Sequence, residues 1–224
     1  MRKLARLLSL FYFSFYLLTL VSANFDFLTI ELFAELEPIN LETVEAQPAT
    51  EETILRSLLE EARKIFSGMI YGYSFKYIPA DKSRQVNEFF DCKLLGEIKW
   101  GDKNLKILKR QIIANRLYVQ FSYELEPFQQ ERLKSWSSLL IPYAMGNGVG
   151  LLIQGALGKE TSLAMAIKEA LRNYLRPQIF NKPREIRGEV LLLETPLTII
   201  YAGAYRTTVK IKINLRELIP YKIY

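Results

Sequence analysis

The sequence predicts an α+β protein in which amphipathic helices pack on antiparallel sheet. Apolar residues recur at helical spacing in residues 51–67 and 160–176, and they alternate with polar residues, as in strands, in residues 116–125 and 206–215. The alternating segments have one apolar and one polar face, which is typical of an antiparallel sheet with one buried side. Each half of the chain has a helix followed by strands, an order that is consistent with two helix-plus-sheet units in tandem.

The N-terminus has the three parts of a secretory signal peptide. Residues 2–6 form a basic head, residues 7–21 are apolar, and Val21-Ser22-Ala23 is a small-residue cleavage site. Because the apolar run has about fifteen residues, short of the roughly twenty that cross a bilayer, we expect cleavage after Ala23 rather than retention as an anchor. Residues 1–23 therefore predict an exported protein in the periplasm or associated with the cell envelope.

The composition excludes several kinds of catalytic site. The chain has no histidine, the commonest general base and transition-metal ligand, so Ser-His-Asp, Cys-His and zinc-protease sites are excluded. Its single cysteine, Cys92, cannot form an intramolecular disulfide, and we expect a small buried hydrophobe rather than a reactive thiol. We therefore expect no metal ion, no cofactor and no enzymatic activity.

Charge is unevenly distributed along the chain. Residues 24–62 contain ten acidic residues and one basic residue, whereas residues 63–224 contain 26 basic and 14 acidic residues. Such asymmetry occurs in proteins that contact an anionic membrane surface or polymer. The basic residues are spread out, however, so we prefer the interpretation that the acidic segment lies against the basic body, and we expect no nucleic-acid partner.

Residues 24–50 are predicted to be an acidic extended leader, because they have no sustained period and contain two prolines. Their apolar start can pack on the body or engage a partner. Thr50, followed by Glu51 and Glu52, is an N-cap with first-turn acidic residues, which predicts a helix start. The helix begins a first α+β unit over residues 51–126.

After this helix the period changes to two, so a strand is expected around residues 71–77, with its aromatic residues on one face. Core packing is the preferred interpretation of that stripe, although aromatic stripes also stack on bases or sugars. The candidate binding residues in the stripe are Tyr71, Tyr73 and Tyr77. Further strands are expected at residues 93–100, 105–113 and 116–125.

Residues 127–159 are predicted to form a helix, up to residue 140, and a glycine-rich connector before a second α+β unit over residues 160–224. In that unit the helix ends at Pro177, and strands are expected at residues 188–194, 197–202 and 206–215. The last strand is expected to turn one set of side chains to the core, Val209, Ile211, Ile213 and Leu215, and another to solvent, Lys210, Lys212 and Asn214.

The connector contains MGNGVGLLIQGALGKET, residues 145–161, whose glycines and Gly-Lys pair resemble a phosphate-binding loop. That loop requires a glycine where this chain has Ile153 and a hydroxyl where it has Glu160. The third glycine of a dinucleotide fingerprint would fall at Leu151. We therefore expect no nucleotide, and we expect Lys159 and Glu160 to be solvated at the start of the next helix.

The stretch from residue 140 to residue 157 is uncharged and is therefore a candidate contact surface. Small residues four apart, such as Ala144 and Gly148, let helices approach closely. A buried loop and helix start is the other interpretation. We expect burial or a protein partner, with peripheral membrane contact as the alternative. The candidate partner-binding residues are Met145, Gly146, Gly148, Gly150, Leu151 and Leu152.

The segment SLAMAIKEALRNYL at residues 162–175, with the closing TTVKIKINL at residues 207–215, resembles a bacterial envelope family. That family includes small outer-membrane lipoproteins and flagellar assembly protein T-like periplasmic proteins, which pair an alanine-rich helix with a short antiparallel sheet. The likeness covers residues 160–215 and, more loosely, residues 51–125. It implies a non-enzymatic structural or assembly role at the envelope.

We therefore expect an exported, non-enzymatic envelope protein that binds protein partners in envelope, flagellar or secretion assembly. The first alternative is a module that binds a small ligand, lipid or glycan through the tyrosine stripe. The second is a glycan hydrolase with paired carboxylates, for which Glu124, Glu126 and Glu131 are the candidates. At a strand end these carboxylates are expected to be solvated.

Overall fold

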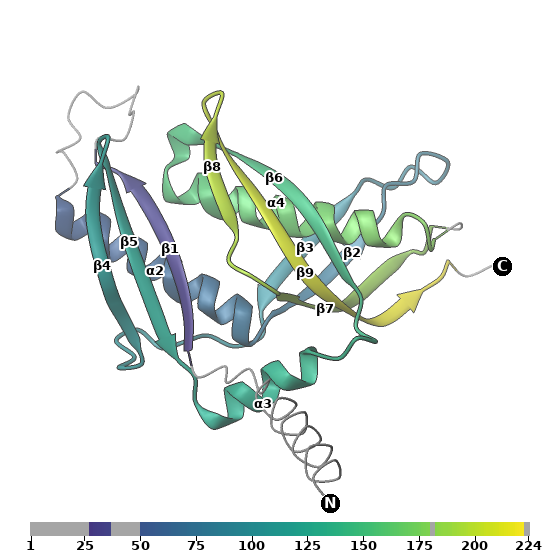
Figure 1. The fold of residues 1–224 in the computed structure, drawn as a ribbon. Helices are drawn as coiled ribbons and strands as arrows, with labels where there is room; N and C mark the ends of the chain where they lie inside the picture. The colour runs from purple at the N-terminus through teal and green to yellow at the C-terminus, as the bar shows by residue number, and fades with distance from the viewer. Residues whose placement is uncertain (1–26, 37–49, 180–181, 222–224) are drawn as a thin grey trace, which may run out of the picture.

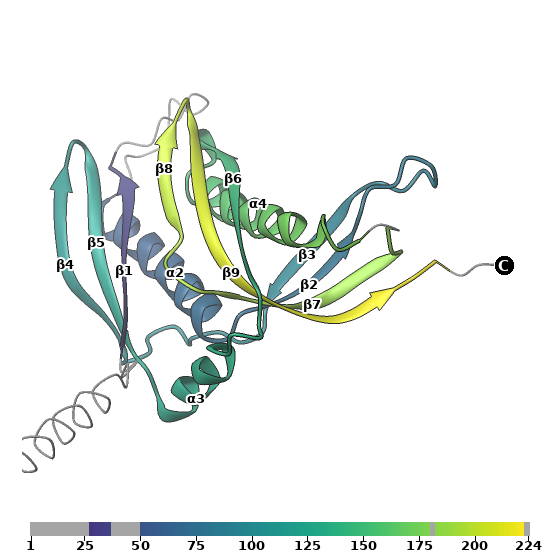
Figure 2. The same cartoon turned by 45° about the vertical axis from the view of Figure 1, so that its right-hand side comes forward.

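The computed structural model describes residues 27–36, 50–179 and 182–221, and the predicted signal peptide lies outside these residues. Within them the chain forms three α-helices and two antiparallel sheets, which confirms the α+β class (Figure 1). Figure 2 shows the two sheets side by side, with α2 (Glu51–Ile70) behind the smaller sheet and α4 (Ala156–Leu175) behind the larger one. None of the described helices is long and apolar enough to span a membrane.

The smaller sheet has the strand order β1-β5-β4. Its strands are β1 (Phe27–Glu35), β5 (Arg116–Glu124) and β4 (Leu105–Ile113). The prediction of an extended leader over residues 24–50 is wrong for β1, which pairs with β5 along its whole length. Ile30 and Leu32 are buried while Thr29 and Glu31 are exposed, a two-residue period too short to stand out from the flanking sequence.

The helix α2 begins at the predicted N-cap. The amide of Thr53 donates to Oγ1 of Thr50 at 3.3 Å, and Glu51 and Glu52 occupy the first turn. The helix turns Leu58, Ala62, Phe66 and other apolar residues into the core and continues to Ile70, beyond the predicted end at residue 67.

The larger sheet has the order β3-β2-β7-β9-β6, with β8 also paired to β9. Its strands are β2 (Tyr73–Ile78), β3 (Phe89–Leu94), β6 (Tyr143–Leu151), β7 (Glu185–Leu192), β8 (Leu197–Tyr201) and β9 (Ala204–Ile219). The strand predicted at residues 93–100 is wrong: β3 lies earlier in the chain, and residues 95–104 form turns and irregular structure.

The two sheets do not correspond to two tandem units. In β2, Tyr73 is paired with Val190 of β7, so strands from both halves of the chain form the larger sheet. The predicted division into residues 51–126 and 160–224 therefore does not follow the sheets. Hydrophobic periodicity indicated strands such as β2, β5 and β9, but it carries no information on which strands pair.

The glycine-rich segment is a strand, β6, and not the expected loop or helix start. Gly146, Gly148 and Gly150 occupy one face of β6, against α4. A Cβ added to Gly148 would lie 1.9 Å from the carbonyl oxygen of Ser162, and one at Gly146 would lie 2.2 Å from the amide nitrogen of Ala170. Glycine at every second position therefore allows the helix backbone to lie directly on the strand.

The closing strand β9 has the predicted core face at Val209, Ile211 and Ile213, which are at most 2% exposed, whereas Leu215 is only half-buried. The expectation for Lys212 is wrong. This side chain is only 8% exposed, and its Nζ donates to the carbonyl oxygen of Ser138 at 2.8 Å, in the loop after α3 (Pro127–Trp136). The helix α3 is shorter than the predicted span to residue 140, so that loop can cover the strand.

Candidate functional site

The tyrosine stripe is part of the core. Tyr73 is 8% exposed and Tyr77 is 6% exposed, and the Tyr77 hydroxyl donates to Glu88 at 2.9 Å. Tyr71 follows the end of α2, where its hydroxyl accepts a bond of 2.8 Å from Gln129. Of the two interpretations of the stripe, the structure supports core packing and not an exposed binding surface.

The candidate residues of the glycine-rich segment lie on opposite faces of β6. Gly146, Gly148 and Gly150 are buried against α4. Met145 and Leu151 point the other way and are 52% and 56% exposed. Leu152 begins the short 3-10 helix η1 (Leu152–Gln154) and is half-buried. The structure therefore leaves Met145 and Leu151 available to a partner and assigns the glycines to internal packing.

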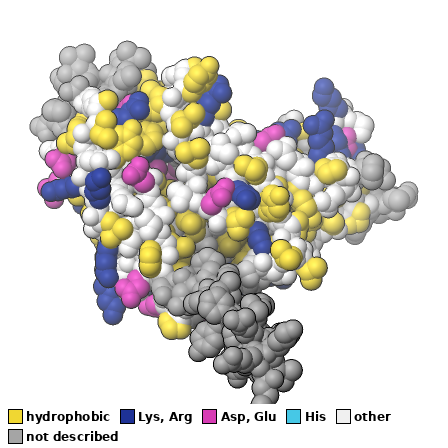
Figure 3. All heavy atoms as spheres, in the orientation of Figure 1, with side chains coloured by type: hydrophobic (Ala, Val, Ile, Leu, Met, Phe, Trp, Pro, Cys, Tyr) yellow, Lys and Arg dark blue, Asp and Glu magenta, His cyan; other side chains and the backbone are white. Residues whose placement is uncertain are grey.

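Met145 and Leu151 belong to a larger surface, here called the outer face, which lies on the side of β6, β8 and β9 away from α4. Its apolar members are between 50% and 65% exposed: Tyr143, Met145, Val149, Leu151, Leu197, Ile199 and Tyr201. Its polar members are Asn147, Arg206, Thr208 and Lys210. Hydrophobic side chains, with Lys and Arg among them, are visible over β8 and β9 in Figure 3. Monomeric proteins rarely expose large contiguous apolar patches without a use for them.

The register of the strands makes the outer face continuous. Arg206 of β9 is paired with Val149 on one side and with Ile199 on the other. A shallow cleft of about 400 Å³ lies at this point and is also lined by Leu197 and Thr208. Apolar side chains from two strands thus flank a central polar row.

The outer face is basic. The guanidinium of Arg206 lies 4.4 Å from the ring centroid of Tyr201, and Nζ of Lys210 lies 5.2 Å from that of Tyr143. No member of the outer face is acidic. The surface therefore combines apolar and aromatic contact area with positive charge.

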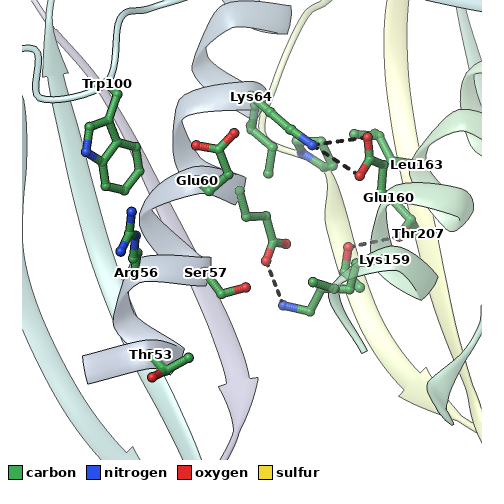
Figure 4. Close-up of a pocket in the computed structure, with 15 residues that line it drawn as sticks. Thr53, Arg56, Ser57, Glu60, Lys64, Trp100, Lys159, Glu160, Leu163 and Thr207 are labelled. Carbon is green, nitrogen blue, oxygen red and sulfur yellow. Dashed lines mark hydrogen bonds and ion pairs between the residues drawn. The ribbon is translucent and has the colours of Figure 1, made fainter. Parts of the chain in front are cut away.

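A separate pocket of about 620 Å³ lies between α2 and α4, a volume typical of small-molecule sites (Figure 4). On one side, Arg56 lies 5.5 Å from the ring centroid of Trp100. On the other side, Lys64 and Glu160 form an ion pair at 3.2 Å. Ile65 and other apolar side chains line the wall between them.

Lys159 lies at the base of this pocket and is only 7% exposed, so the expectation that it is solvated is wrong. Its Nζ forms an ion pair with Glu61 at 2.9 Å, donates to the carbonyl oxygen of Phe33, and lies 4.6 Å from the Phe33 ring centroid. Burial raises the pKa of Glu61, against the opposing effect of Lys159. Lys159 thus connects α4 to β1 and α2, a long-range contact that no local pattern could reveal.

A chain of hydroxyl groups lies beside Lys159. Ser162 and Thr207 are 2.6 Å apart, and Thr207 and Thr198 are 2.9 Å apart. Thr198 and Thr207 line the pocket, so its base is polar while its walls are largely apolar. Sequence reasoning missed this group, because its members are contributed by α4, β8 and β9.

The candidate carboxylates do not line this pocket. Glu124 pairs with Lys106 at 3.2 Å, Glu131 pairs with Lys134 at 2.7 Å, and Glu126 is the N-cap of α3 in a capping box. Each has a local structural contact. Among the described residues there is also no group of three or more side chains suited to holding a metal ion.

A protein-family model matches residues 17–221. The chain is 22% identical over 169 residues to a protein of Treponema pallidum (strain Nichols) described as an uncharacterised protein. That alignment covers 75% of this chain and 71% of the relative. No solved structure matches the chain.

Proposed function

The chain belongs to the family whose model matches residues 17–221, and from this premise we propose that it is an exported, non-enzymatic cell-envelope protein that binds a protein partner through the outer face. The exposed apolar side chains of β6 and β8 are the observation that supports this proposal. The signal-peptide pattern of residues 1–23 supports the envelope location. The resemblance to envelope assembly proteins supports a role in envelope, flagellar or secretion assembly.

The outer face defines the chemistry of its partner. Protein interfaces place aromatic and aliphatic side chains at their centre, with Arg as a frequent contributor. Here Arg206 is held over Tyr201, between Val149 and Ile199. Because the face has positive charge and no acidic member, the complementary surface is apolar with acidic residues.

Site-specific photocrosslinking in the producing cell tests the proposal. A photoreactive amino acid at Met145 or Ile199 is expected to crosslink to one and the same envelope protein. The control position is Ile112 of β4, which is 57% exposed, slightly more than Met145 and Ile199, but lies on the smaller sheet. Crosslinks that are absent from both outer-face positions, or identical at Ile112, would contradict a partner at the outer face.

A matched pair of substitutions provides a second measurement. Val149→Asp places a negative charge on an exposed position and is expected to abolish the crosslink from Ile199 without unfolding the chain. Ile112→Asp is the control and should leave that crosslink unchanged. Mass spectrometry of the exported chain tests the location: a mature protein that begins at Asn24 is expected, and an uncleaved protein found inside the cell would oppose the envelope role.

A small-ligand module is the second candidate function, and the pocket between α2 and α4 is the observation that favours it. Its size, apolar walls and polar base suit an amphipathic small molecule. Trp100 is 54% exposed at the rim, whereas Trp136 is 6% exposed, so a ligand in the pocket should change mainly the fluorescence of Trp100. Titration with lipids and glycans, with Trp100→Phe as control, would detect it, and unchanged emission throughout would oppose this function.

A further inference from the structure

A cleft of about 640 Å³ lies between the two sheets, beside the edge strands β1 and β8, and it is here called the edge cleft. Residues 29–33 of β1 line one wall, together with Arg116, Tyr118 and Gln120 on the adjoining face of β5. Residues 195–200 line the other wall, which includes most of β8. Alternate residues of β5 line the cleft with one face, whereas consecutive residues of β1 and β8 line it, as strands do where they present a backbone edge. β1 and β8 are each paired on one side only within the described residues, with β5 and β9 respectively.

The hydrogen-bond pattern shows which backbone groups of β1 face the cleft. The amide of Leu36 donates to the carbonyl oxygen of Asn115 at 3.0 Å, so the even-numbered residues of β1 bond to β5. The odd-numbered residues therefore direct their N–H and C=O groups toward the cleft. The bond from Lys159 to the carbonyl oxygen of Phe33 agrees, because it reaches β1 from the cleft side.

The pairing of β9 with β6 shows which backbone groups of β8 face the cleft. The amide of Leu152 donates to the carbonyl oxygen of Gly203 at 3.3 Å. By the register of the two strands, the odd-numbered residues of β9 therefore form their backbone hydrogen bonds with β6. The even-numbered residues of β9 then bond to β8, through partners such as Ile199 opposite Arg206. The N–H and C=O groups of Thr198 and Ile200 are left to face the edge cleft.

Both edges have the orientation that one added strand requires. In Figures 1 and 2, β1 and β8 lie side by side and their arrows point the same way. A single strand running in the opposite direction would be antiparallel to both, and each pairing would have the usual strand spacing of about 4.8 Å. Exposed strand edges are templates for such pairing.

We propose that the edge cleft accepts an extended segment of a partner protein, which adds as a strand to β1 and β8 and joins the two sheets. This inference goes beyond the proposed function, because it concerns backbone edges and not the outer face. Leu197 and Ile199 belong to both surfaces, so apolar side chains on the outward row of the added strand would extend the outer face. Thr198 and the Lys159–Glu61 pair line the cleft, which favours small polar side chains on the inward row.

The proposed ligand is therefore an extended, proline-free segment with alternating apolar and small polar residues. Backbone hydrogen bonds supply affinity in strand addition, and alternate side chains supply specificity. Proline is excluded because it cannot donate to either edge.

Peptide selection on the folded protein tests this inference. A random peptide library displayed on phage is selected against the full mature chain, and the affinity of enriched synthetic peptides is measured for variants of each edge. Glu31→Pro and Ile200→Pro remove an N–H group that faces the cleft while keeping the ladder bonds to β5 and β9. Glu31→Ala and Ile200→Val retain the N–H group and are the matched controls.

The expected result is that enriched peptides alternate as described and bind both proline variants about tenfold or more weakly, with the controls within about twofold of the wild type. Amide hydrogen exchange of the wild-type chain gives a readout that does not depend on the folding of any variant. Bound peptide should slow exchange at Thr29, Glu31 and Phe33 of β1, and at Thr198 and Ile200 of β8.

The inference is overturned if no peptide is enriched, if enriched peptides bind the proline variants as tightly as the controls, or if these amides gain no protection. The outcome can be separated from that of the proposed function. Val149→Asp is expected to remove the crosslink at the outer face and to leave the affinity for the peptide unchanged. A peptide that loses affinity to Val149→Asp but not to Glu31→Pro binds the outer face, and strand addition is then wrong.

Discussion

Replacing Gly148 by alanine tests whether α4 lies directly on β6. An added Cβ would be 1.9 Å from the carbonyl oxygen of Ser162 and 2.3 Å from the amide nitrogen of Ala166. Ordinary contact begins at 3.4 Å, so one of the two elements must move by about 1.5 Å. Both atoms belong to the helix backbone, and no rotation of a side chain can relieve the clash.

We expect Gly148→Ala to lower the free energy of unfolding by about 3 kcal/mol, in the upper part of the range for overpacking. The reason is that the whole helix α4 must shift, and its residues Ala166 and Ala170 are fully buried. A loss of this size is a large fraction of the 5–15 kcal/mol that stabilise a typical domain. Urea unfolding followed by circular dichroism measures it as a lower transition midpoint with an unchanged slope. Val149→Ala, on the opposite face of the same strand, should cost about 0.5 kcal/mol or less. If Gly148→Ala unfolds at the wild-type midpoint, the close packing of strand and helix is wrong.

Three further predictions use other parts of the chain. Ile211→Ala should lower the free energy of unfolding in urea by about 2–5 kcal/mol. Lys212→Ala should lower it by about 1 kcal/mol, because the lysine is buried and donates to one backbone carbonyl oxygen. A Lys212→Ala variant as stable as the wild type would contradict that hydrogen bond. The Ser83 hydroxyl, with help from Arg84, lowers the pKa of Asp81 to about 2, so Ser83→Ala should raise the midpoint in a carboxyl NMR titration. Since the pKa of Asp81 in the folded chain lies below its ordinary value of 3.8, the stabilisation is present above that pH and is lost as the pH falls toward about 2. Burial raises the pKa of the Cys92 thiol to about 12, so a disulfide reagent near pH 8 should react slowly with the native chain and rapidly in denaturant; equal rates would place the thiol at the surface.

The elements that follow one clear period were predictable from the sequence. The strand β5 alternates over its whole length, and Leu117, Val119, Phe121 and Tyr123 are all buried as expected. Local chemistry also located the start of α2, because the Thr50 cap needs only neighbouring residues. In such segments the local pattern and the tertiary burial agree.

Local pattern was misleading where a side chain is absent or its partner is distant. The strand β6 was missed because glycines at alternate positions have no side chains to show a period, although the space they leave is occupied by α4. Lys159 follows a glycine in an uncharged stretch, and nothing nearby indicates that Glu61 and Phe33 surround it. Of the proposed outer face, the sequence indicated Met145 and Leu151, whose side chains are exposed in the structure. The strand β8, which completes this face, lies too far along the chain to be associated with them.

The pairing of β2 with β7 has a consequence for how the chain reaches its native state. During synthesis, residues 73–78 emerge long before residues 185–192, with which they form hydrogen bonds in the larger sheet. Until then β2 and β3 can form only a two-stranded hairpin, which is marginally stable in water and leaves an edge unpaired. Contacts between residues so distant in sequence slow folding, because a long loop must close before they form. The N-terminal half is thus prone to aggregation until β7 has been synthesised and has paired with β2. A chain truncated before residue 185 would keep the edge of β2 unpaired.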